Sequence, residues 1–455
     1  MSTRGSTCRV RELGAQGDGK RDDTAALQAA FDRAAELGEG VVLVSPGVYR
    51  VRETLSFRAD GCQLLGVGQP TILADELLPR ILDSDGRSQL RIAGLRVRGT
   101  GVHDVGGRGA IHLDERSTAC TVENTEVHDA PGTGIVDDGA GNTIRGNVVR
   151  GTGEHGIYVS GCRHGVYSAN RITGAGEVHG ATLLAHGLSI ADASECRIVD
   201  NLVEGGRGLG LVLRDGAHDN VVSGNTVRGT GDRLLLIGSG SRNLLCDNRL
   251  EQPPPGRDAL QVTGGGSNRI ERNFIRVTTS GSAALRWVGD EPSGGDLVKG
   301  NVVLLDGKAV DYHTVELDAP RAGPVLLIDN TIQAVRLAAP ASAVRRRSGR
   351  APQLEGNLVQ DDRHARTLGA GVHHVERTDL ALRCDPRQGS VHVMLPAAGV
   401  SRWRTIAIGR PASGYPVVVQ GDGDDRIAGE RVLSLPPGRA RLYLQCDGGG
   451  WHILL

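Results

Sequence analysis

The sequence predicts an all-β chain wound into a parallel β-helix, and a repeat in its central part is the main observation behind this prediction. The pattern apolar-x-x-Asn-x-apolar occurs nine times between Ile144 and Val359, at intervals of 23 to 31 residues between successive asparagines. Repeats of this length are typical of stacked solenoids, because no single unit can bury its apolar face alone. We expect two short strands and a turn in each repeat.

The asparagine of each repeat has a predicted structural role at the bend between two strands. Asparagine tolerates left-handed backbone geometry, and stacked copies can hydrogen-bond to one another along the axis of a solenoid. We therefore expect an asparagine ladder. Its members are Asn147, Asn170, Asn201, Asn225, Asn248, Asn273, Asn301, Asn330 and Asn357.

Composition favours one long, turn-rich β object. The 455 residues include 67 Gly without the period of three that marks collagen. A formal net charge of −1 gives no electrostatic argument for nucleic-acid binding. No apolar run approaches the roughly 20 residues that span a bilayer, and no signal segment is recognised. A cytoplasmic protein without a membrane partner is expected, with export by another route or association with a virion as the alternatives.

Eight cysteines are spread along the chain without a CxxC pair or another metal-binding spacing. Several occupy apolar positions beside the repeats, where a free cysteine behaves as a small hydrophobic residue. We therefore expect buried thiols with a packing role.

Residues 10–50 are predicted to form a strand, a helix and a second strand ahead of the repeats. Asp22 and Asp23 supply N-cap oxygens, residues 25–37 form an amphipathic helix, and Gly38 ends it. A lone helix at this place would cover the open end of a solenoid, which otherwise exposes unpaired strand edges.

The segment from Gly14 to Ala30, GAQGDGKRDDTAALQAA, and the strand that follows it through Tyr49 resemble the N-terminal motif of the pectate-lyase-like superfamily of right-handed β-helices. That superfamily includes polygalacturonase-like hydrolases, alginate epimerases, inulin fructotransferases and phage tailspikes. The resemblance implies a right-handed parallel β-helix with an N-terminal helical cap, and it leaves the reaction open.

The pattern changes after about residue 365. Strands are expected at 391–396, 405–408, 417–419 and 442–444, separated by Gly, Pro and Asp turns. This part resembles the small β-sandwich-like modules at the ends of phage tail fibres, which implies a capping or oligomerising role and a homotrimer. The predicted domains are an N-terminal cap (1–60), a parallel β-helix (61–365) and a C-terminal β-module (366–455).

Polar side chains of successive coils are predicted to line up on one outer face, because each coil adds one strand spacing of roughly 4.8 Å. Alignment of the coils by their Gly-apolar-x-apolar strands brings Asp114, Asp137 or Asp138, Tyr158, Ser189 and Arg214 to one strip. Glu154 and His155 precede one of these strands, and the overlong coil between Asn170 and Asn201 adds Glu177, His179 and His186. Such a cluster can supply a general acid, a general base and an anion partner.

The candidate catalytic residues are Asp137, Asp138, His155, Tyr158, Glu177, His179, His186 and Arg214, and the candidate substrate-binding residues are Asp114, Glu154 and Ser189. In a lyase or epimerase, His155, His179 or Tyr158 would move a proton, and Arg214 would hold the acidic group. Asp137 with Asp138 would act as an acid or bind a metal. Calcium suits such carboxylates, although no EF-hand spacing exists and no metal ligand is assigned.

Three segments of this region resemble motifs of individual families. His186-Gly187 resembles the His-Gly segment of polygalacturonase-like hydrolases. The paired aspartates that this family places about one coil earlier are absent here. The segment 132–138 is similar in position to an alginate epimerase motif, of which only Asp137 matches. Glu177 lies in a segment that resembles a loop of inulin fructotransferases.

The expected function is that of a carbohydrate-active enzyme, a lyase, epimerase or glycoside-cleaving enzyme that acts on a glycan or uronate-type substrate by acid/base chemistry. Two alternatives stay open. The same scaffold would act as a lyase, isomerase or cyclase on a small intracellular metabolite, which the 3% aromatic content favours. Otherwise the chain is a non-catalytic, trimeric, tailspike-like structural or glycan-binding protein. An enzyme predicts one groove beside residues 173–187, whereas a spike predicts dispersed acidic and histidine residues.

Overall fold

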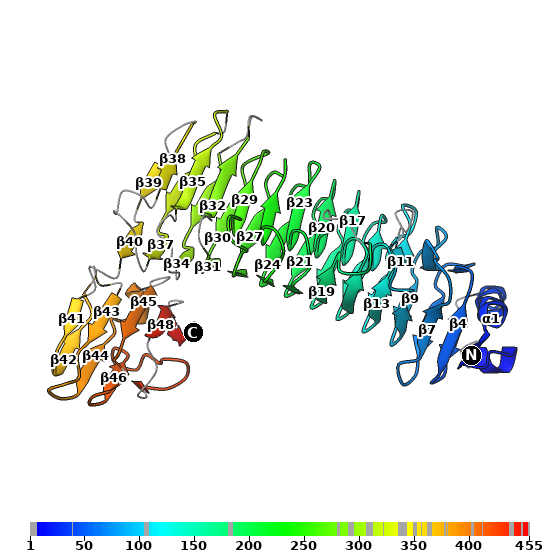
Figure 1. Cartoon of the computed structure of the whole chain (residues 1–455), viewed down its shortest axis with the longest axis horizontal. Helices are drawn as coiled ribbons and strands as arrows, with labels where there is room; N and C mark the ends of the chain where they lie inside the picture. The colour runs from blue at the N-terminus through cyan, green and yellow to red at the C-terminus, as the bar shows by residue number, and fades with distance from the viewer. Residues whose placement is uncertain are drawn as a thin grey trace.

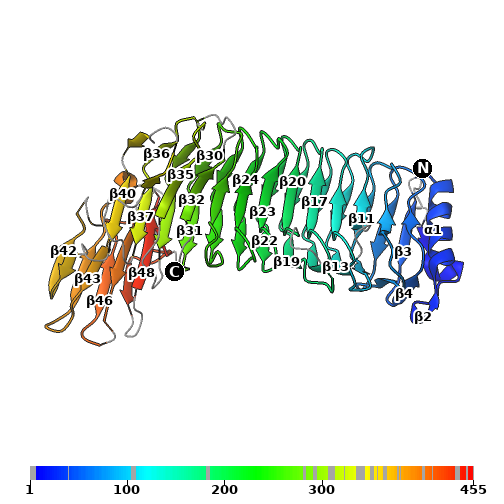
Figure 2. The same cartoon turned by 45° about the horizontal axis from the view of Figure 1, so that its top comes forward.

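The computed structural model describes residues 7–453 except 39, 104–108, 181–184, 280–282, 290–294, 306–312, 322, 335–343, 349–352, 356, 362–365, 377–378, 380, 402–404, 412, 436–440 and 447–448. It confirms the predicted all-β fold class. The coils stack along one axis, with the helix α1 (Thr24–Glu36) at one end and small β-sheets at the other (Figures 1 and 2). No helix in this described part of the chain is long and apolar enough to cross a membrane.

Three long parallel sheets form the walls of the solenoid. Sheet 1 has 14 strands from β1 (Thr7–Arg9) to β39 (Gln353–Glu355), and sheet 2 has 14 strands from β2 (Asp18–Asp22) to β40 (Leu358–Asp361). Sheet 3 has 12 strands. In chain order they are β5 (Leu55–Ser56), β8 (Arg80–Asp83), β11 (Gly109–Leu113), β14 (Ile135–Asp137), β17 (Ile157–Ser160), β20 (Leu188–Ala191), β23 (Leu211–Arg214), β26 (Leu235–Ile237), β29 (Leu260–Val262), β32 (Ala283–Val288), β35 (His313–Asp318) and β38 (Val344–Arg346).

The predicted asparagine ladder is confirmed over all nine members. Each side-chain amide from Asn147 to Asn330 donates to the amide oxygen of the next asparagine at 2.8–3.0 Å. The same amide also donates to a backbone carbonyl; for Asn225 this is the carbonyl of Ile198. Because one side chain satisfies several buried backbone groups, it fixes the bend and the register of the neighbouring coil.

A second, shorter ladder stacks at the turn before sheet 1, and the repeat pattern does not predict it. Asn220, Asn243 and Asn268 donate in sequence along the axis, and Asn268 donates to Asp296. Trp287 also donates to this buried carboxylate at 2.8 Å, while burial raises the pKa of Asp296. All eight cysteines are free and buried, as expected from their apolar surroundings.

The predicted N-terminal helix is present and lies over the first coil. Its buried face includes Leu27 and Phe31, and the Phe31 ring meets Phe57 edge-on at 4.8 Å. Asp22 accepts the N–H and the hydroxyl proton of Thr24, which begins the helix. Asp23 makes no capping bond to the helix, because its carboxylate accepts the N–H groups of Gln16 and Gly17 instead.

The C-terminal module has two small sheets around a core of its own. One contains β41 (Arg366–Leu368), β43 (Ala381–Cys384), β45 (Thr405–Gly409), β48 (Arg441–Cys446) and β49 (Trp451–Ile453), and the other contains β42 (Gly371–His374), β44 (Val391–Met394), β46 (Val417–Gln420) and β47 (Val432–Leu435). Parallel pairs such as β43 with β45 are followed by antiparallel pairs such as β45 with β48. The homotrimer predicted from this module stays a prediction.

Replacing Asn225 by alanine tests the ladder. The substitution removes donors to Ile198 and Asn248 and the acceptor for Asn201. Buried groups left without a partner cost about 1–3 kcal/mol each, so we expect the free energy of unfolding, measured by urea titration, to fall by at least about 2 kcal/mol. Arg197→Ala on the exposed face of the same region is the matched control, with an expected change within about 0.5 kcal/mol. Equal effects of the two substitutions would contradict a stabilising ladder.

Candidate active site

The outer face of sheet 3 carries the polar side chains that the sequence analysis selected. Strand register places Asp83, His112, Val136, Tyr158 and Ser189 in one column across β8, β11, β14, β17 and β20. Alternate residues of the same strands point into the core, because side chains of a strand alternate between its two faces. Neighbouring members of the column are therefore one strand spacing apart.

Five predicted residues come together in what we call the central cluster, defined as His155, Tyr158, His186, Ser189 and Arg214. The imidazole of His155 stacks on the rings of Tyr158 and His186, with centroids 5.2 and 4.9 Å apart. The Arg214 guanidinium lies 5.6 Å from the centroid of the Tyr158 ring. Its Nε donates to the Ser189 hydroxyl at 3.3 Å. The Ser189 side chain is fully buried, so this hydrogen bond fixes the position of the Arg214 guanidinium.

Backbone hydrogen bonds fix how the two histidines of the central cluster carry their protons. Nδ1 of His155 accepts the N–H of His186 at 3.0 Å, and Nδ1 of His186 accepts the N–H of Leu209 at 3.3 Å. Burial, helped by neighbouring positive charge, lowers the pKa of His155 to about 3 and that of His186 to about 4. Both rings are therefore neutral near pH 7 and carry their hydrogen on Nε2, where each acts as a donor.

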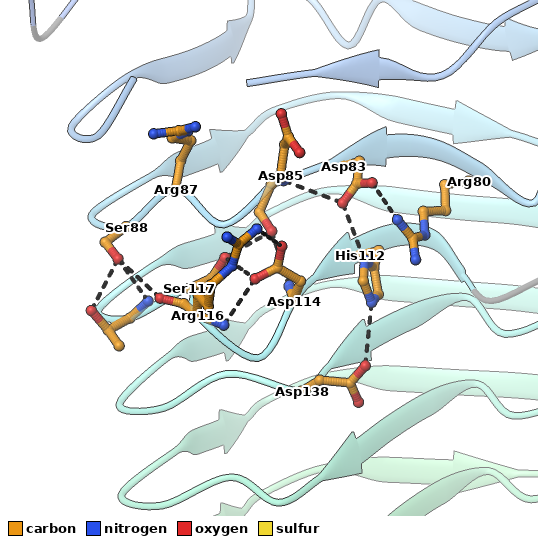
Figure 3. A network of polar contacts seen from close by, with 12 residues as sticks. Arg80, Asp83, Asp85, Arg87, Ser88, His112, Asp114, Arg116, Ser117 and Asp138 are labelled. Carbon is orange, nitrogen blue, oxygen red and sulfur yellow. Dashed lines mark hydrogen bonds and ion pairs between the residues drawn. The ribbon is translucent and has the colours of Figure 1, made fainter. Parts of the chain in front are cut away.

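A second polar group lies on the adjacent strands, and we call it the carboxylate–imidazole group: Asp83, His112 and Asp138. His112 stands between the two carboxylates, with Nδ1 at 3.1 Å from Asp83 and Nε2 at 3.2 Å from Asp138 (Figure 3). Arg80 donates to the far oxygen of Asp83. Because both ring nitrogens face carboxylates, both act as donors and the ring is an imidazolium.

The charges of this group follow from its contacts. Burial opposes a positive His112, which is only 3% exposed, yet the bonds to Asp138 and Asp83 outweigh it and raise the pKa of His112. Burial likewise opposes a negative Asp83, but His112 and Arg80 lower the pKa of Asp83 to about 2. Asp138 remains partly exposed and presents its carboxylate to solvent beside the imidazolium.

Asp138 is among the site residues predicted from the sequence, whereas Asp83 and His112 are not. His112 stands in the same strand column as Tyr158 and Ser189, whereas the predicted Asp114 lies two residues further along its coil. A stricter alignment of residues by register would have found His112. Asp114 forms a turn, because its carboxylate accepts the N–H of Arg116 and lies 3.5 Å from the Ser117 hydroxyl (Figure 3).

Asp137 lies in the interior of the coil, which corrects the prediction that it reaches the outer strip. It pairs in register with the buried residues Leu113 and Val159. Its carboxylate accepts hydrogen bonds from Tyr167 and Asn142, each at 2.7 Å, and burial raises its pKa. These contacts give Asp137 a structural role and keep it from substrate on the outer face.

The overlong coil contributes His186 to the central cluster and places the other two selected residues elsewhere. Glu177 is exposed and accepts the N–H of Gly206 at 3.3 Å. His179 is exposed, and its carbonyl accepts the N–H of His103, so that two distant coils meet at this point. Glu154 lies at this junction, 4.0 Å from His103.

Within the described residues, no group of three or more His, Cys, Asp or Glu side chains is arranged to hold a metal ion. The carboxylates proposed for calcium point to different partners, because Asp137 is internal and Asp138 binds His112.

Two family models of known proteins match this chain. The family model described as "Right handed beta helix region" matches residues 86–284, and the one described as "Rhamnogalacturonase A/epimerase, pectate lyase-like" matches residues 7–80. The chain therefore has the fold of a right-handed parallel β-helix. This agrees with the resemblance of its N-terminal segment and with the stacked parallel sheets.

Curated relatives of this β-helix protein include mannuronan C5-epimerase AlgE5 of Azotobacter vinelandii, which is 28% identical over 234 residues, 46% of this chain and 23% of the epimerase. Alginate lyase 7 of the same organism is 55% identical over 42 residues, 9% of this chain and 5% of the lyase. The match thus spans less than a quarter of the length of these relatives.

Solved structures show the same fold. The A-module of mannuronan C-5 epimerase AlgE4 from Azotobacter vinelandii superposes with a TM-score of 0.60 at 19% identity, over 78% of this chain and 96% of the module. The tailspike protein of E. coli bacteriophage HK620, solved in complex with a pentasaccharide, gives 0.56 at 12% identity, over 91% of this chain and 80% of the tailspike.

The imidazolium of His112 makes stability depend on pH. Because its pKa is raised above the ordinary 6.5, its contribution to stability is fully present below pH 6.5 and is lost as the pH rises through the folded-state value. We expect the gap in unfolding free energy between wild type and His112→Gln to narrow as the pH is raised from 6.5, as measured by urea titrations. Arg197→Ala should follow the wild-type profile. A gap that widens with pH would contradict the assignment.

Proposed function

We propose that this β-helix protein is a carbohydrate-active enzyme that transfers a proton on an acidic sugar residue bound over β17, β20 and β23. The observation that carries the proposal is the central cluster, in which a guanidinium, two neutral imidazole N–H donors and a phenol converge on one outward face. The names of the relatives support it, since mannuronan and alginate are polymers of uronic acids.

Arg214 is the anchor for the substrate carboxylate. Its orientation is set by Ser189, and a guanidinium can make two parallel bonds to a carboxylate. The Nε2–H groups of His155 and His186 add neutral donors on the same face. Donors fixed in this way stabilise negative charge that develops on the carboxylate when the neighbouring carbon loses its proton.

Tyr158 is the group that takes this proton. His155 and His186 have their acceptor nitrogens occupied by backbone N–H groups, and His179 lies outside the central cluster. The step requires Tyr158 to have released its hydroxyl proton to solvent beforehand. The oxygen of Tyr158 then accepts the proton from carbon, and the electron pair of the broken C–H bond moves onto the carboxylate. Return of a proton to the other face of that carbon gives the epimer, whereas expulsion of the glycosidic oxygen at the next carbon gives an unsaturated sugar.

Asp138 serves the second proton transfer. It follows β14, the strand next to the one that carries Tyr158, and its carboxylate contacts Nε2 of His112. The His112 imidazolium, which is itself held by Asp83, orients the Asp138 carboxylate. Hydrogen-bonded neighbours commonly orient the functional side chains of a site in this way. The Asp138 carboxylate takes the Nε2 proton of the His112 imidazolium and passes it on, which leaves His112 as a neutral imidazole. In a lyase this proton goes to the leaving oxygen, and in an epimerase it goes to the carbon.

The proposal predicts loss of turnover in Tyr158→Phe and Arg214→Gln. General acid–base catalysis contributes about 100-fold to 10,000-fold, so Tyr158→Phe should lower kcat by at least about 100-fold, whereas Arg214→Gln should also raise KM. The assay combines the full chain with polymannuronate, polyguluronate or polygalacturonate in D2O, and follows deuterium incorporation by NMR and unsaturated product by ultraviolet absorbance.

The exposed Arg242, which pairs with Asp219 at a turn, provides the matched control Arg242→Gln with unchanged turnover expected. Deuterium in an intact polymer identifies an epimerase, and unsaturated product identifies a lyase. Full activity in Tyr158→Phe would contradict the assigned proton carrier. Binding of a polyuronate without either product would contradict the proposed enzymatic activity and would favour a tailspike-like glycan-binding protein.

A further inference from the structure

The C-terminal module contains a pocket of about 610 Å³ at the ends of β41, β43 and β45. Three arginines line it, Arg383, Arg387 and Arg410, together with one carboxylate, Asp385. Thr367 and Ser413, which carry hydroxyl groups, also line it. The volume lies in the range of small-molecule sites, which is about 300–1,000 Å³, and exceeds what a lone ion needs.

Arg410 is the unusual residue of this pocket. It is only 5% exposed, and two nitrogens at the end of its guanidinium donate to the backbone carbonyls of Leu435 and Gly414. Its buried Nε has no hydrogen-bond partner, and no carboxylate among the described residues forms an ion pair with it. A buried charge is costly unless an opposite charge accompanies it, so the guanidinium is suited to an anion that enters the pocket.

The other groups of the pocket do not supply that anion. Asp385 is taken by Arg387, which contacts it through Nε at 2.8 Å and through Nη2 at 2.6 Å. Burial raises the pKa of the neighbouring Cys384 thiol to about 12, so this thiol is neutral near pH 7. Arg383 is exposed and has no ion-pair partner among the described residues. The pocket therefore holds two positive charges without a counter-charge.

We propose that this pocket binds the anionic group of an acidic sugar residue, as a second glycan site that lies outside the groove of sheet 3. Arg410 and Arg383 bind the carboxylate or sulfate, and Thr367 and Ser413 offer hydroxyls to the sugar ring. The assignment of a sugar as the ligand rests on the proposed function, whereas the preference for an anion rests on the pocket alone. The site would retain a chain of acidic glycan while the groove acts on another part of it.

The test measures binding of an oligouronate to the full chain by calorimetry in the background of Tyr158→Phe with Arg214→Gln, which disables the groove. We expect remaining binding that Arg383→Gln weakens about ten-fold, the change expected from one lost charge-assisted hydrogen bond. Thr367→Val should weaken it less. Arg431→Gln, on an exposed residue of the same module paired with Asp424, is the matched control with unchanged affinity. Arg410→Gln is a second variant, at the buried arginine. If the Arg410→Gln variant does not fold, Arg383→Gln still tests the proposal.

Two comparisons decide between sources of the anion. A neutral oligosaccharide of the same length should not bind, and inorganic phosphate should compete only weakly. Phosphate that binds as tightly as the oligouronate, or unchanged oligouronate affinity in Arg383→Gln, would overturn the proposal. Its failure is distinguishable from failure of the proposed function, because turnover of polyuronates by the wild-type chain is measured independently of pocket binding.

Discussion

The hydrogen bond from one asparagine side chain to the next is the constraint on which the rest of this protein depends. Buried backbone groups at the bend of each coil need partners, and each left without one costs about 1–3 kcal/mol. Asn201, for example, donates to the carbonyl of Tyr167 and to Asn225 while its oxygen serves Asn170. The ladder thus sets the offset between coils, and this offset decides which side chains share an outward column.

The proposed function depends on that alignment because the central cluster is assembled from consecutive coils. Tyr158, Ser189 and Arg214 come from β17, β20 and β23, and no loop is needed to bring them together. The site divides its charges between neutral imidazoles at one place and an imidazolium at another. His155 is neutral because it is buried beside positive charge, whereas His112 is charged because two carboxylates surround it.

The fold could be predicted from the asparagine spacing, because a ladder residue recurs at every coil whatever the sequence and length of the rest of that coil. The central cluster could be predicted from strand alignment. Asp137 is predicted on the outer face of its strand but lies on the inner one. Alternation along a strand determines the face on which a residue lies only once the register of the strand is known. The asparagine spacing does not predict the second ladder, whose column is occupied by Cys196 as well as by Asn220. Glu177 and His179 depend on the path of a loop, which residue spacing does not encode.

The most direct test of the account is a crystal structure of the full-length Tyr158→Phe variant with a short oligouronate. The account predicts a sugar carboxylate within hydrogen-bond distance of the Arg214 guanidinium, with the ring above residue 158 and the glycan running along the solenoid axis past Asp138. An oligouronate that occupies sheet 1 or sheet 2, or that lies on sheet 3 without contact to Arg214, His155 or His186, would contradict the claim that the aligned column is the active site.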